Sequence, residues 1–126
     1  PAGPAHRRRR GLSAYLSGCA AEETAATGYD RRGADLLETR WRGKGGEIDL
    51  IFYQDGIYIF CEVKKAASVD EAAGRLRRSQ MQRIHAAASE YLSHTPDGQL
   101  SEVRFDLAVV DDTGHLEIIE NAFGHF

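Results

Sequence analysis

Residues 45–64 read GGEIDLIFYQDGIYIFCEVK, and this stretch decides the fold of the chain. Two runs within it, 48–53 and 57–63, are rich in β-branched and aromatic side chains, which favour β-strands. Asp55-Gly56 lies between the runs, and this dipeptide is the strongest short signal of a hairpin turn. The stretch therefore predicts a β-hairpin.

Four charged side chains are expected at the open end of this hairpin. Counting back from a two-residue loop puts Asp49 opposite Glu62 and Glu47 opposite Lys64. All four share one face, because side chains alternate along a strand. Opposed carboxylates have Cβ atoms roughly 5 Å apart and repel each other unless a cation lies between them. The register therefore predicts a cation site; the simpler alternative is an exposed strand end with a Glu47–Lys64 pair.

Mg²⁺ suits such a site. It prefers carboxylate oxygens and is usually held by one or two of them, while water and substrate phosphates complete its shell. Lys64 lies two residues beyond Glu62 on the same face, roughly 7 Å away, where it could reach water or a phosphate oxygen. This arrangement favours the hydrolysis of a phosphodiester.

The hairpin and its surroundings resemble a known family. Residues 45–51, GGEIDLI, followed by residues 60–64, FCEVK, are similar to the YraN-like proteins, small bacterial chains regarded as nucleases of the PD-(D/E)XK superfamily. That superfamily includes restriction endonucleases and archaeal Holliday-junction resolvases. The resemblance extends from about residue 18 onward, through Trp41-Arg42, the RFD sequence at 104–106 and the NAF sequence at 121–123. It implies a restriction-endonuclease-like fold and a nuclease activity.

The resemblance also implies roles for individual residues. Asp49 corresponds to the metal-binding aspartate, and Glu62 and Lys64 correspond to the acid and the lysine of the (D/E)XK element. The backbone carbonyl of Val63 and the helix-borne Glu22 would approach the same ion, Mg²⁺ or Mn²⁺. Lys64 would orient the attacking water and stabilise charge on the phosphate.

Each of the two long predicted helices carries a polar side chain that is expected near this site. Periodicity alone leaves open whether Glu22 or Glu23 faces the site, and the family register favours Glu22. Gln80 stands where the family usually has a lysine, on the same helical stripe as several apolar residues. A polar side chain on such a stripe either hydrogen-bonds a catalytic carboxylate or lies at the wet edge of the helix.

The net charge of -3 does not argue against a nucleic-acid partner, because the basic residues are concentrated in the middle of the chain. Nuclease affinity depends on local phosphate neutralisation rather than on total charge. The arginines at 75–83 are interpreted as a solvated helix face. Predicted nucleic-acid contacts, in and around the strand that leads to the hairpin through a flexible glycine loop, are Arg40, Arg42, Lys44 and Lys65.

Composition is that of one globular domain. The 126 residues are 42% hydrophobic and 28% charged, and no apolar run approaches the roughly 20 residues that span a bilayer. No signal peptide follows the arginine run at 7–10, and the histidines and cysteines lack zinc-ligand spacing. We expect a disordered basic tail over 1–12, a single nuclease-like domain over 13–126, reduced cysteines and a cytoplasmic location.

The remaining patterns predict helices at 13–31 and 68–94 and strands at 36–42, 103–110 and 116–119. With the hairpin, the order is αβββαββ, which suits an α/β fold with a central mixed sheet flanked by helices. Both hairpin faces are apolar away from the charged end, with Ile48, Leu50 and Phe52 on one face and Ile51, Tyr53 and Phe60 on the other.

The expected function is a Mg²⁺- or Mn²⁺-dependent endonuclease that hydrolyses DNA, at branched or otherwise structured sites. Cutting a junction would require a symmetric homodimer, because two opposed strands must be cleaved. The alternatives are a catalytically inactive nuclease-fold module that binds nucleic acid or a protein partner, and an accessory protein whose acidic rim is structural.

Overall fold

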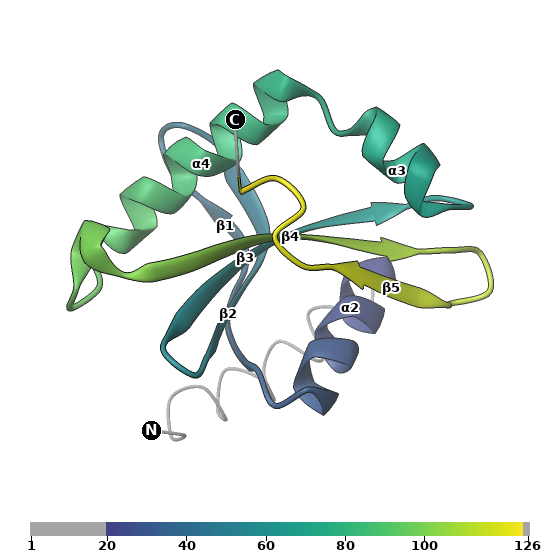
Figure 1. Ribbon diagram of the computed structural model, residues 1–126, viewed down its shortest axis with the longest axis horizontal. Helices are drawn as coiled ribbons and strands as arrows, with labels where there is room; N and C mark the ends of the chain where they lie inside the picture. Colours follow the sequence, from purple (N-terminus) through teal and green to yellow (C-terminus); the bar gives the residue numbers. More distant parts are fainter. Residues whose placement is uncertain (1–19, 125–126) are drawn as a thin grey trace.

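One mixed sheet organises the computed structural model, which describes residues 20–124 (Figure 1). Its strand order is the sequence order, β1-β2-β3-β4-β5, and only the β3–β4 pair is parallel. The strands are β1 (Asp35–Arg42), β2 (Glu47–Gln54), β3 (Ile57–Lys65), β4 (Glu102–Val110) and β5 (Leu116–Ile119).

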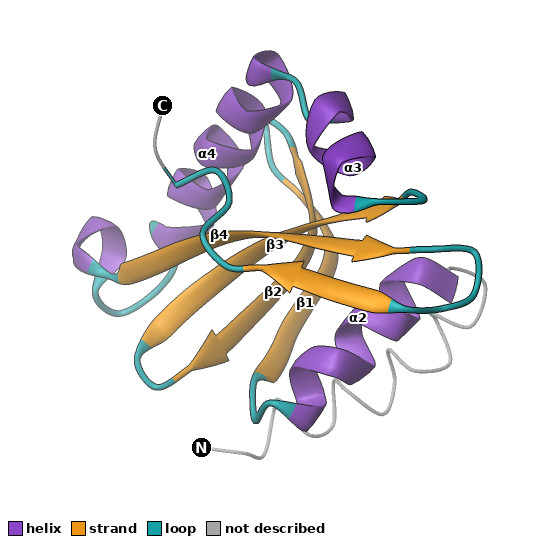
Figure 2. Ribbon diagram, turned by 45° about the vertical axis from the view of Figure 1, so that its right-hand side comes forward, coloured by secondary structure: helices purple, strands orange, loops and turns teal. Residues whose placement is uncertain are grey.

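Helices cover both faces of this sheet. Helix α2 (Ala20–Arg31) packs on one face, and α3 (Val69–Arg75) and α4 (Arg78–Leu92) lie on the other (Figure 2). A 3₁₀ turn, η1 (Gly98–Leu100), connects α4 to β4. The predicted α/β class with a helix-flanked mixed sheet is therefore confirmed. The expectations for residues 1–12 and for the start of the first helix at residue 13 lie outside the described residues.

The predicted second helix is wrong in one respect, because it is divided in two. Leu76 and Arg77 have extended backbone between α3 and α4, so the order becomes αβββααββ. Ser68, where the second helix was predicted to start, caps α3 by accepting a hydrogen bond from the Glu71 N–H at 3.1 Å. At the break, Leu76 packs against the apolar clusters under both helices.

The hairpin register follows the prediction near the turn. Tyr53 pairs with Tyr58, and Asp55 and Gly56 have φ angles of 52° and 84°, the positive values that a type I′ turn requires. The ladder between β2 and β3 runs from this turn to Leu50, which pairs with Cys61.

The predicted side-chain faces are wrong at one position. Leu50 and Phe52 face α2, as expected for alternating residues, but Ile48 packs with Ile51 on the α4 side. The change of face lies at the level of Arg40 on β1, which has a φ of 47° and stands between the pairs Thr39–Leu50 and Trp41–Ile48. Ile48 and Leu50 therefore break the expected alternation of β2 and lie on opposite faces of the sheet.

The glycine loop between β1 and β2 is not the flexible connection predicted from its composition. The backbone N–H of Lys44 donates to Glu90 of α4 at 2.8 Å, and the Gly43 N–H donates to the Gly46 carbonyl at 2.9 Å. A Cβ atom on Gly46 would lie 2.7 Å from the Arg83 carbonyl oxygen. The loop therefore packs directly on α4, and this contact sets where β2 begins.

We expect Gly46→Ala to destabilise the protein by about 1–3 kcal/mol, because its methyl group meets helix backbone that cannot move aside. Urea unfolding would measure the change. Gly74→Ala is the matched control, since no atom lies within 4 Å of its added Cβ, and there the substitution should raise stability slightly. Equal effects at the two positions would contradict the tight packing of the loop.

A buried polar network joins α2, β4 and the segment after β5. Asp106 is fully buried and accepts hydrogen bonds from the Tyr29 hydroxyl at 2.6 Å and the Asn121 N–H at 2.9 Å. Arg104 donates to both carboxylate oxygens, at 2.9 and 3.0 Å. Asn121 in turn accepts from the Phe105 N–H at 3.1 Å. Four donors therefore satisfy one buried carboxylate, which ties the last described turn to the core.

None of the helices within residues 20–124 is long and apolar enough to cross a membrane. Cys61 is a buried free thiol, in agreement with the reduced state predicted for it, whereas Cys19 lies outside the described part of the chain.

Candidate active site

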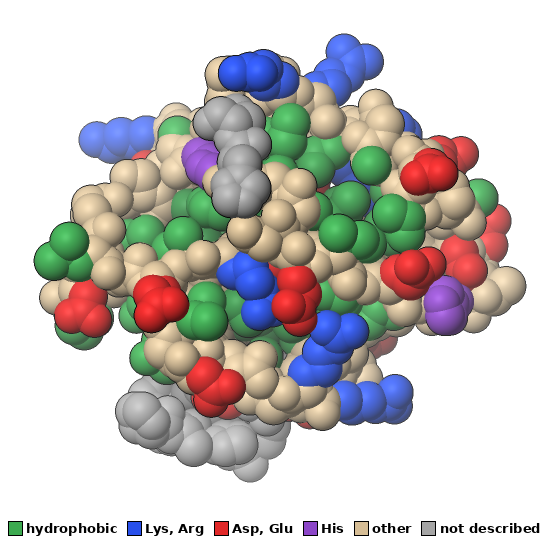
Figure 3. Space-filling view, viewed as in Figure 1, with side chains coloured by type: hydrophobic (Ala, Val, Ile, Leu, Met, Phe, Trp, Pro, Cys, Tyr) green, Lys and Arg blue, Asp and Glu red, His purple; other side chains and the backbone are tan. Residues whose placement is uncertain are grey.

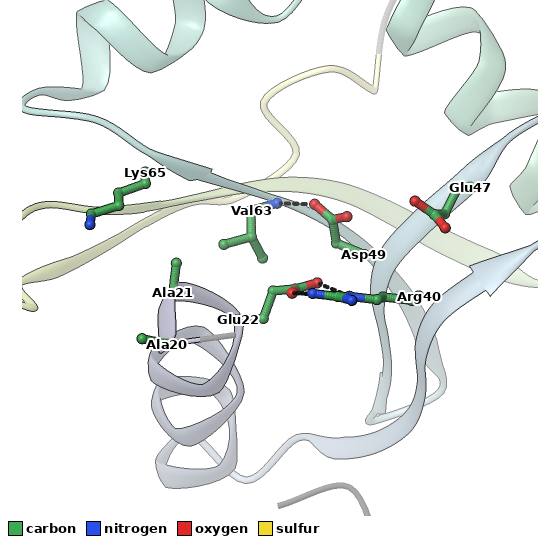
Figure 4. A pocket seen from close by; sticks show the side chains of 8 residues that line it. All are labelled: Ala20, Ala21, Glu22, Arg40, Glu47, Asp49, Val63 and Lys65. Atoms are coloured by element: carbon green, nitrogen blue, oxygen red, sulfur yellow. Dashed lines mark hydrogen bonds and ion pairs between the residues drawn. The ribbon is translucent and has the colours of Figure 1, made fainter. Parts of the chain in front are cut away.

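Asp49 stands where two pockets meet at the end of the sheet. The α2-side pocket, of about 520 Å³, is lined by Glu22, Arg40, Glu47, Asp49, Val63 and Lys65, with the first residues of α2 (Figure 4). The α4-side pocket, of about 220 Å³, is lined by Glu47, Asp49, Glu62, Gln80, Arg83 and Ile84. Asp49 lies between Ile48 and Leu50, where the alternation of β2 is broken, and it lines both pockets.

Asp49 and Glu62 form a close carboxyl pair. Burial is the main cause that raises the pKa of Asp49; the Val63 N–H, which donates to it at 2.8 Å, opposes the rise, and the nearby Glu22 adds to it. Burial and then the charge of Asp49 raise the pKa of Glu62 to about 8. Two neighbouring carboxyl groups that are partly removed from water favour either a proton or a bound cation between them.

Glu62 is held from its other side by Lys64 and Gln80. The Gln80 amide donates to Glu62 Oε2 at 2.6 Å and accepts from Lys64 Nζ at 3.3 Å. Lys64 Nζ also lies 3.3 Å from Glu62 Oε2. A glutamine can serve both neighbours because one amide carries a donor and an acceptor, which a lysine at position 80 would not.

Of the two glutamates at the start of α2, Glu22 faces Asp49. It lines the α2-side pocket and is bound by the Arg40 guanidinium, whose Nη2 lies 2.8 Å and whose Nε lies 3.2 Å from Oε1 (Figure 4). Glu23 lines a different pocket, beside His115 and Leu116. The structure therefore places the helix acid favoured by the family register next to the hairpin acids.

The predicted basic residues separate into two groups. Arg40 and Lys65 line the α2-side pocket, and Lys65 Nζ lies 3.7 Å from the exposed Asp112. Arg42 forms an exposed ion pair with Glu47 at 3.0 Å, and Lys44 belongs to the loop that packs on α4. Of these four residues, only Arg40 and Lys65 can therefore approach a ligand in that pocket without rearrangement of the loop.

Arginines 75, 77, 78 and 83 are exposed along α3 and α4, in agreement with a solvated face, and basic side chains stand out where these helices meet (Figure 3). Arg83 also lines the α4-side pocket. Its role near the acids was missed, because a basic helix face carries no signal of which arginine borders a pocket.

No three acidic, histidine or cysteine side chains in residues 20–124 converge into a preformed metal cluster. Each predicted ligand instead contacts a protein donor: Glu22 contacts Arg40, Asp49 contacts the Val63 N–H, and Glu62 contacts Gln80. The donor chemistry nevertheless fits Mg²⁺ or Mn²⁺, since the predicted side-chain ligands are all carboxylates, Glu62 is buried, and the charge of Asp49 raises the pKa of Glu62.

The Glu62→Gln substitution tests the strain in this carboxyl pair. A carboxyl group with a raised pKa favours the folded state while it is protonated. The free energy of unfolding should therefore fall as the pH rises from 4.5, the ordinary pKa of a glutamate, through about 8, the pKa of Glu62 in the fold. Relative to the wild type without metal, Glu62→Gln should therefore be more stable above pH 8, on the order of 2 kcal/mol, and should lose this advantage in acid.

Unfolding in EDTA across that pH range would measure this difference. Glu47→Gln is the matched control, because Glu47 lies at the same end of the sheet but is exposed and paired with Arg42. A gain for Glu62→Gln that does not change with pH would contradict the strained pair.

Fold and site together define a mixed α/β protein with an acidic, two-pocket end of the sheet. The model of the Uncharacterised protein family UPF0102 matches residues 21–110, and the chain belongs to this family, the YraN-like group. It is 52% identical over 116 residues to a UPF0102 protein of Ruegeria pomeroyi, covering 92% of this chain and 94% of the relative. It is also similar to a UPF0102 protein of Cereibacter sphaeroides, at 53% identity over 113 residues that cover 90% and 97% of the two chains.

Proposed function

We propose that this protein is a Mg²⁺- or Mn²⁺-dependent endonuclease of the PD-(D/E)XK type that hydrolyses phosphodiester bonds of DNA. The observation that supports this proposal is the proximity of the buried carboxyl group of Glu62 to the half-buried carboxyl group of Asp49, with Lys64 beside them and a pocket on either side. Such a pair costs stability unless a cation or a proton compensates it. A binding module has no evident need for that cost.

In this proposal each residue has a defined part. Asp49 and Glu62 hold the ion, and Glu22 and the Val63 carbonyl are the remaining protein ligands. When bound, the ion would act as a Lewis acid toward the phosphate and lower the pKa of water. Lys64 stabilises the negative charge that develops on the phosphate, because its ammonium group already lies at the pair.

Other side chains bind the DNA or keep the catalytic side chains in position. Gln80 keeps Glu62 and Lys64 at fixed distances from each other, since it bonds both. Arg40 and Lys65 neutralise phosphates of the DNA backbone in the α2-side pocket, so affinity should be modest and salt-dependent. Branched DNA is the proposed substrate, a symmetric dimer the proposed cutting unit and the cytoplasm the proposed compartment.

The second candidate is a nuclease-fold module that binds nucleic acid or a protein without cutting it. One observation favours it: Glu22, Asp49 and Glu62 are each already bound to a protein donor.

Metal-dependent stabilisation separates these proposals at low cost. Mn²⁺ or Mg²⁺ well above its dissociation constant should raise the melting temperature by about 5 °C or more, because binding to the folded state stabilises it. Asp49→Asn should abolish this rise. Asp55→Asn is the matched control, because it lies in the distant turn, where asparagine tolerates a positive φ, and it should keep the rise.

Cleavage is then measured on linear, nicked and four-way-junction DNA with both variants. The wild type and Asp55→Asn should cut, and Asp49→Asn should not. Cleavage retained by Asp49→Asn would show a contaminating activity and contradict the proposal. Binding without cleavage with every metal would favour the second candidate.

A further inference from the structure

Arg40 has a backbone conformation that its residue type does not favour. Three non-glycine residues in the described chain have a positive φ: Arg40 at 47°, Asp55 at 52° and Asn121 at 52°. Asp and Asn adopt this left-handed region readily, whereas an arginine gains nothing local from it. An unfavourable conformation inside a strand persists only when contacts elsewhere compensate it.

Contacts to Glu22 contribute to this compensation. Arg40 Nε lies 3.2 and 3.4 Å from the two oxygens of Glu22, and Nη2 lies 2.8 Å from Oε1. The Glu22 side chain is only 13% exposed, so its charge depends on this guanidinium more than a surface carboxylate would. The pair forms part of the wall of the α2-side pocket, which Asp49 also lines (Figure 4).

Arg40 and a metal ion would compete for the charge of Glu22. Contacts from the guanidinium reach both oxygens of Glu22, so an ion that uses this carboxylate weakens the hold of Arg40 on it. The Arg40 side chain, which is 41% exposed, already borders the pocket where a DNA phosphate would lie, and a weaker pair with Glu22 makes it more available to that phosphate.

We propose that Arg40 is a positioning residue that holds Glu22 in the metal-free protein and exchanges it for a DNA phosphate when the ion binds. This inference rests on the proposed function. The ion attracts Glu22, and the phosphate attracts Arg40. When one ligand is bound, the Arg40–Glu22 pair is already weakened, so the other ligand binds at a lower cost in free energy. Metal and DNA therefore bind with positive coupling, and either ligand alone binds more weakly.

Arg42 provides the contrast on the same strand. It also pairs with a glutamate, Glu47, at 3.0 Å, but the two side chains are 79% and 42% exposed. Exposed pairs of this kind are weak and dissociate at little cost. A neutral substitution at Arg42 removes the same charge from the same strand without releasing Glu22.

The experiment measures the Mn²⁺ dissociation constant by electron paramagnetic resonance of free Mn²⁺, with and without a short DNA duplex, before product accumulates. Arg40→Asn is the principal variant, because asparagine tolerates the left-handed backbone and the fold should be kept. Arg40→Gln is a second variant, and Arg42→Asn is the matched control. Without DNA, both Arg40 variants should bind Mn²⁺ about fivefold or more tightly than the wild type, and Arg42→Asn within about twofold.

DNA should strengthen Mn²⁺ binding by the wild type and by Arg42→Asn, and this gain should be lost in the Arg40 variants. In a Glu22→Gln background, Arg40→Asn should no longer tighten Mn²⁺ binding, because the competed carboxylate is gone. This last readout would not respond to a purely structural role of Arg40.

If the wild type binds Mn²⁺ and the Arg40 variants bind it equally or more weakly, the exchange is overturned while the proposed function stands. Equal tightening by Arg42→Asn also overturns it, because charge alone would then be responsible. If neither the wild type nor any Arg40 variant binds Mn²⁺, the exchange and the proposed function are both wrong.

Discussion

Lys64→Ala is expected to lose about 10²–10³-fold in the rate of DNA cleavage at saturating DNA and metal. The Lys64 ammonium group lies 3.3 Å from Glu62 Oε2 and 3.3 Å from Gln80 Oε1, so its position is fixed before a substrate arrives. A donor held in place stabilises developing charge without reorganisation, and alanine removes that donor entirely. Single-turnover cleavage of junction DNA would measure the loss.

Lys65→Ala is the control for this prediction. It removes the same charge from the next residue, but Lys65 lines the opposite, α2-side pocket and its side chain is 66% exposed. DNA binding should become weaker and less salt-dependent, while the rate at saturating DNA should be nearly unchanged. Equal loss of that rate in both variants would contradict the role proposed for Lys64.

Asp106→Ala is expected to reduce the free energy of unfolding by about 3–5 kcal/mol. The substitution leaves the Tyr29 hydroxyl and the Asn121 N–H without their acceptor and leaves Arg104 without its buried partner. Total stabilities of small domains are about 5–15 kcal/mol, so the variant should be marginal or unfolded at growth temperature. Urea unfolding, followed by circular dichroism, would measure the change.

Asp111→Ala is the matched control. Asp111 accepts hydrogen bonds from the N–H groups of Thr113 and His115, but it does so in the β4–β5 turn and not in the core. It should therefore cause only a small loss. Tyr29→Phe tests the same network from another element and should have an intermediate effect, because Asp106 keeps its other donors. Equal losses at Asp106 and Asp111 would contradict the stabilising role of the network.

Much of the fold could be predicted because its signals are local. The Asp55-Gly56 turn sets the hairpin register, alternation along β3 puts Glu62 and Lys64 on one face, and Ser68 caps α3 where the second helix was predicted to start. The proximity of Asp49 and Glu62 followed from counting alone. These features depend on neighbours in sequence or on one turn, so the chain itself specifies them.

The features that sequence did not predict depend on contacts between distant elements. Arg40, with its left-handed backbone, is bound to Glu22 of α2, and Gly46 packs on Arg83 of α4. The break at Leu76 follows from two apolar clusters under separate helices. An arginine in a strand or a glycine in a loop has the same local pattern whether or not such a partner exists.

The Asp106 network has a consequence for how the protein is made. The Tyr29–Asp106 hydrogen bond joins residues 77 positions apart, whereas the β2–β3 hairpin pairs residues only a few positions apart near its turn. Local pairings close quickly and distant ones close slowly. During translation the hairpin can form early, but Asp106 lacks its Asn121 donor until that residue has left the ribosome tunnel. We therefore expect nascent chains to be protease-sensitive and to reach their final stability only after synthesis has passed Asn121.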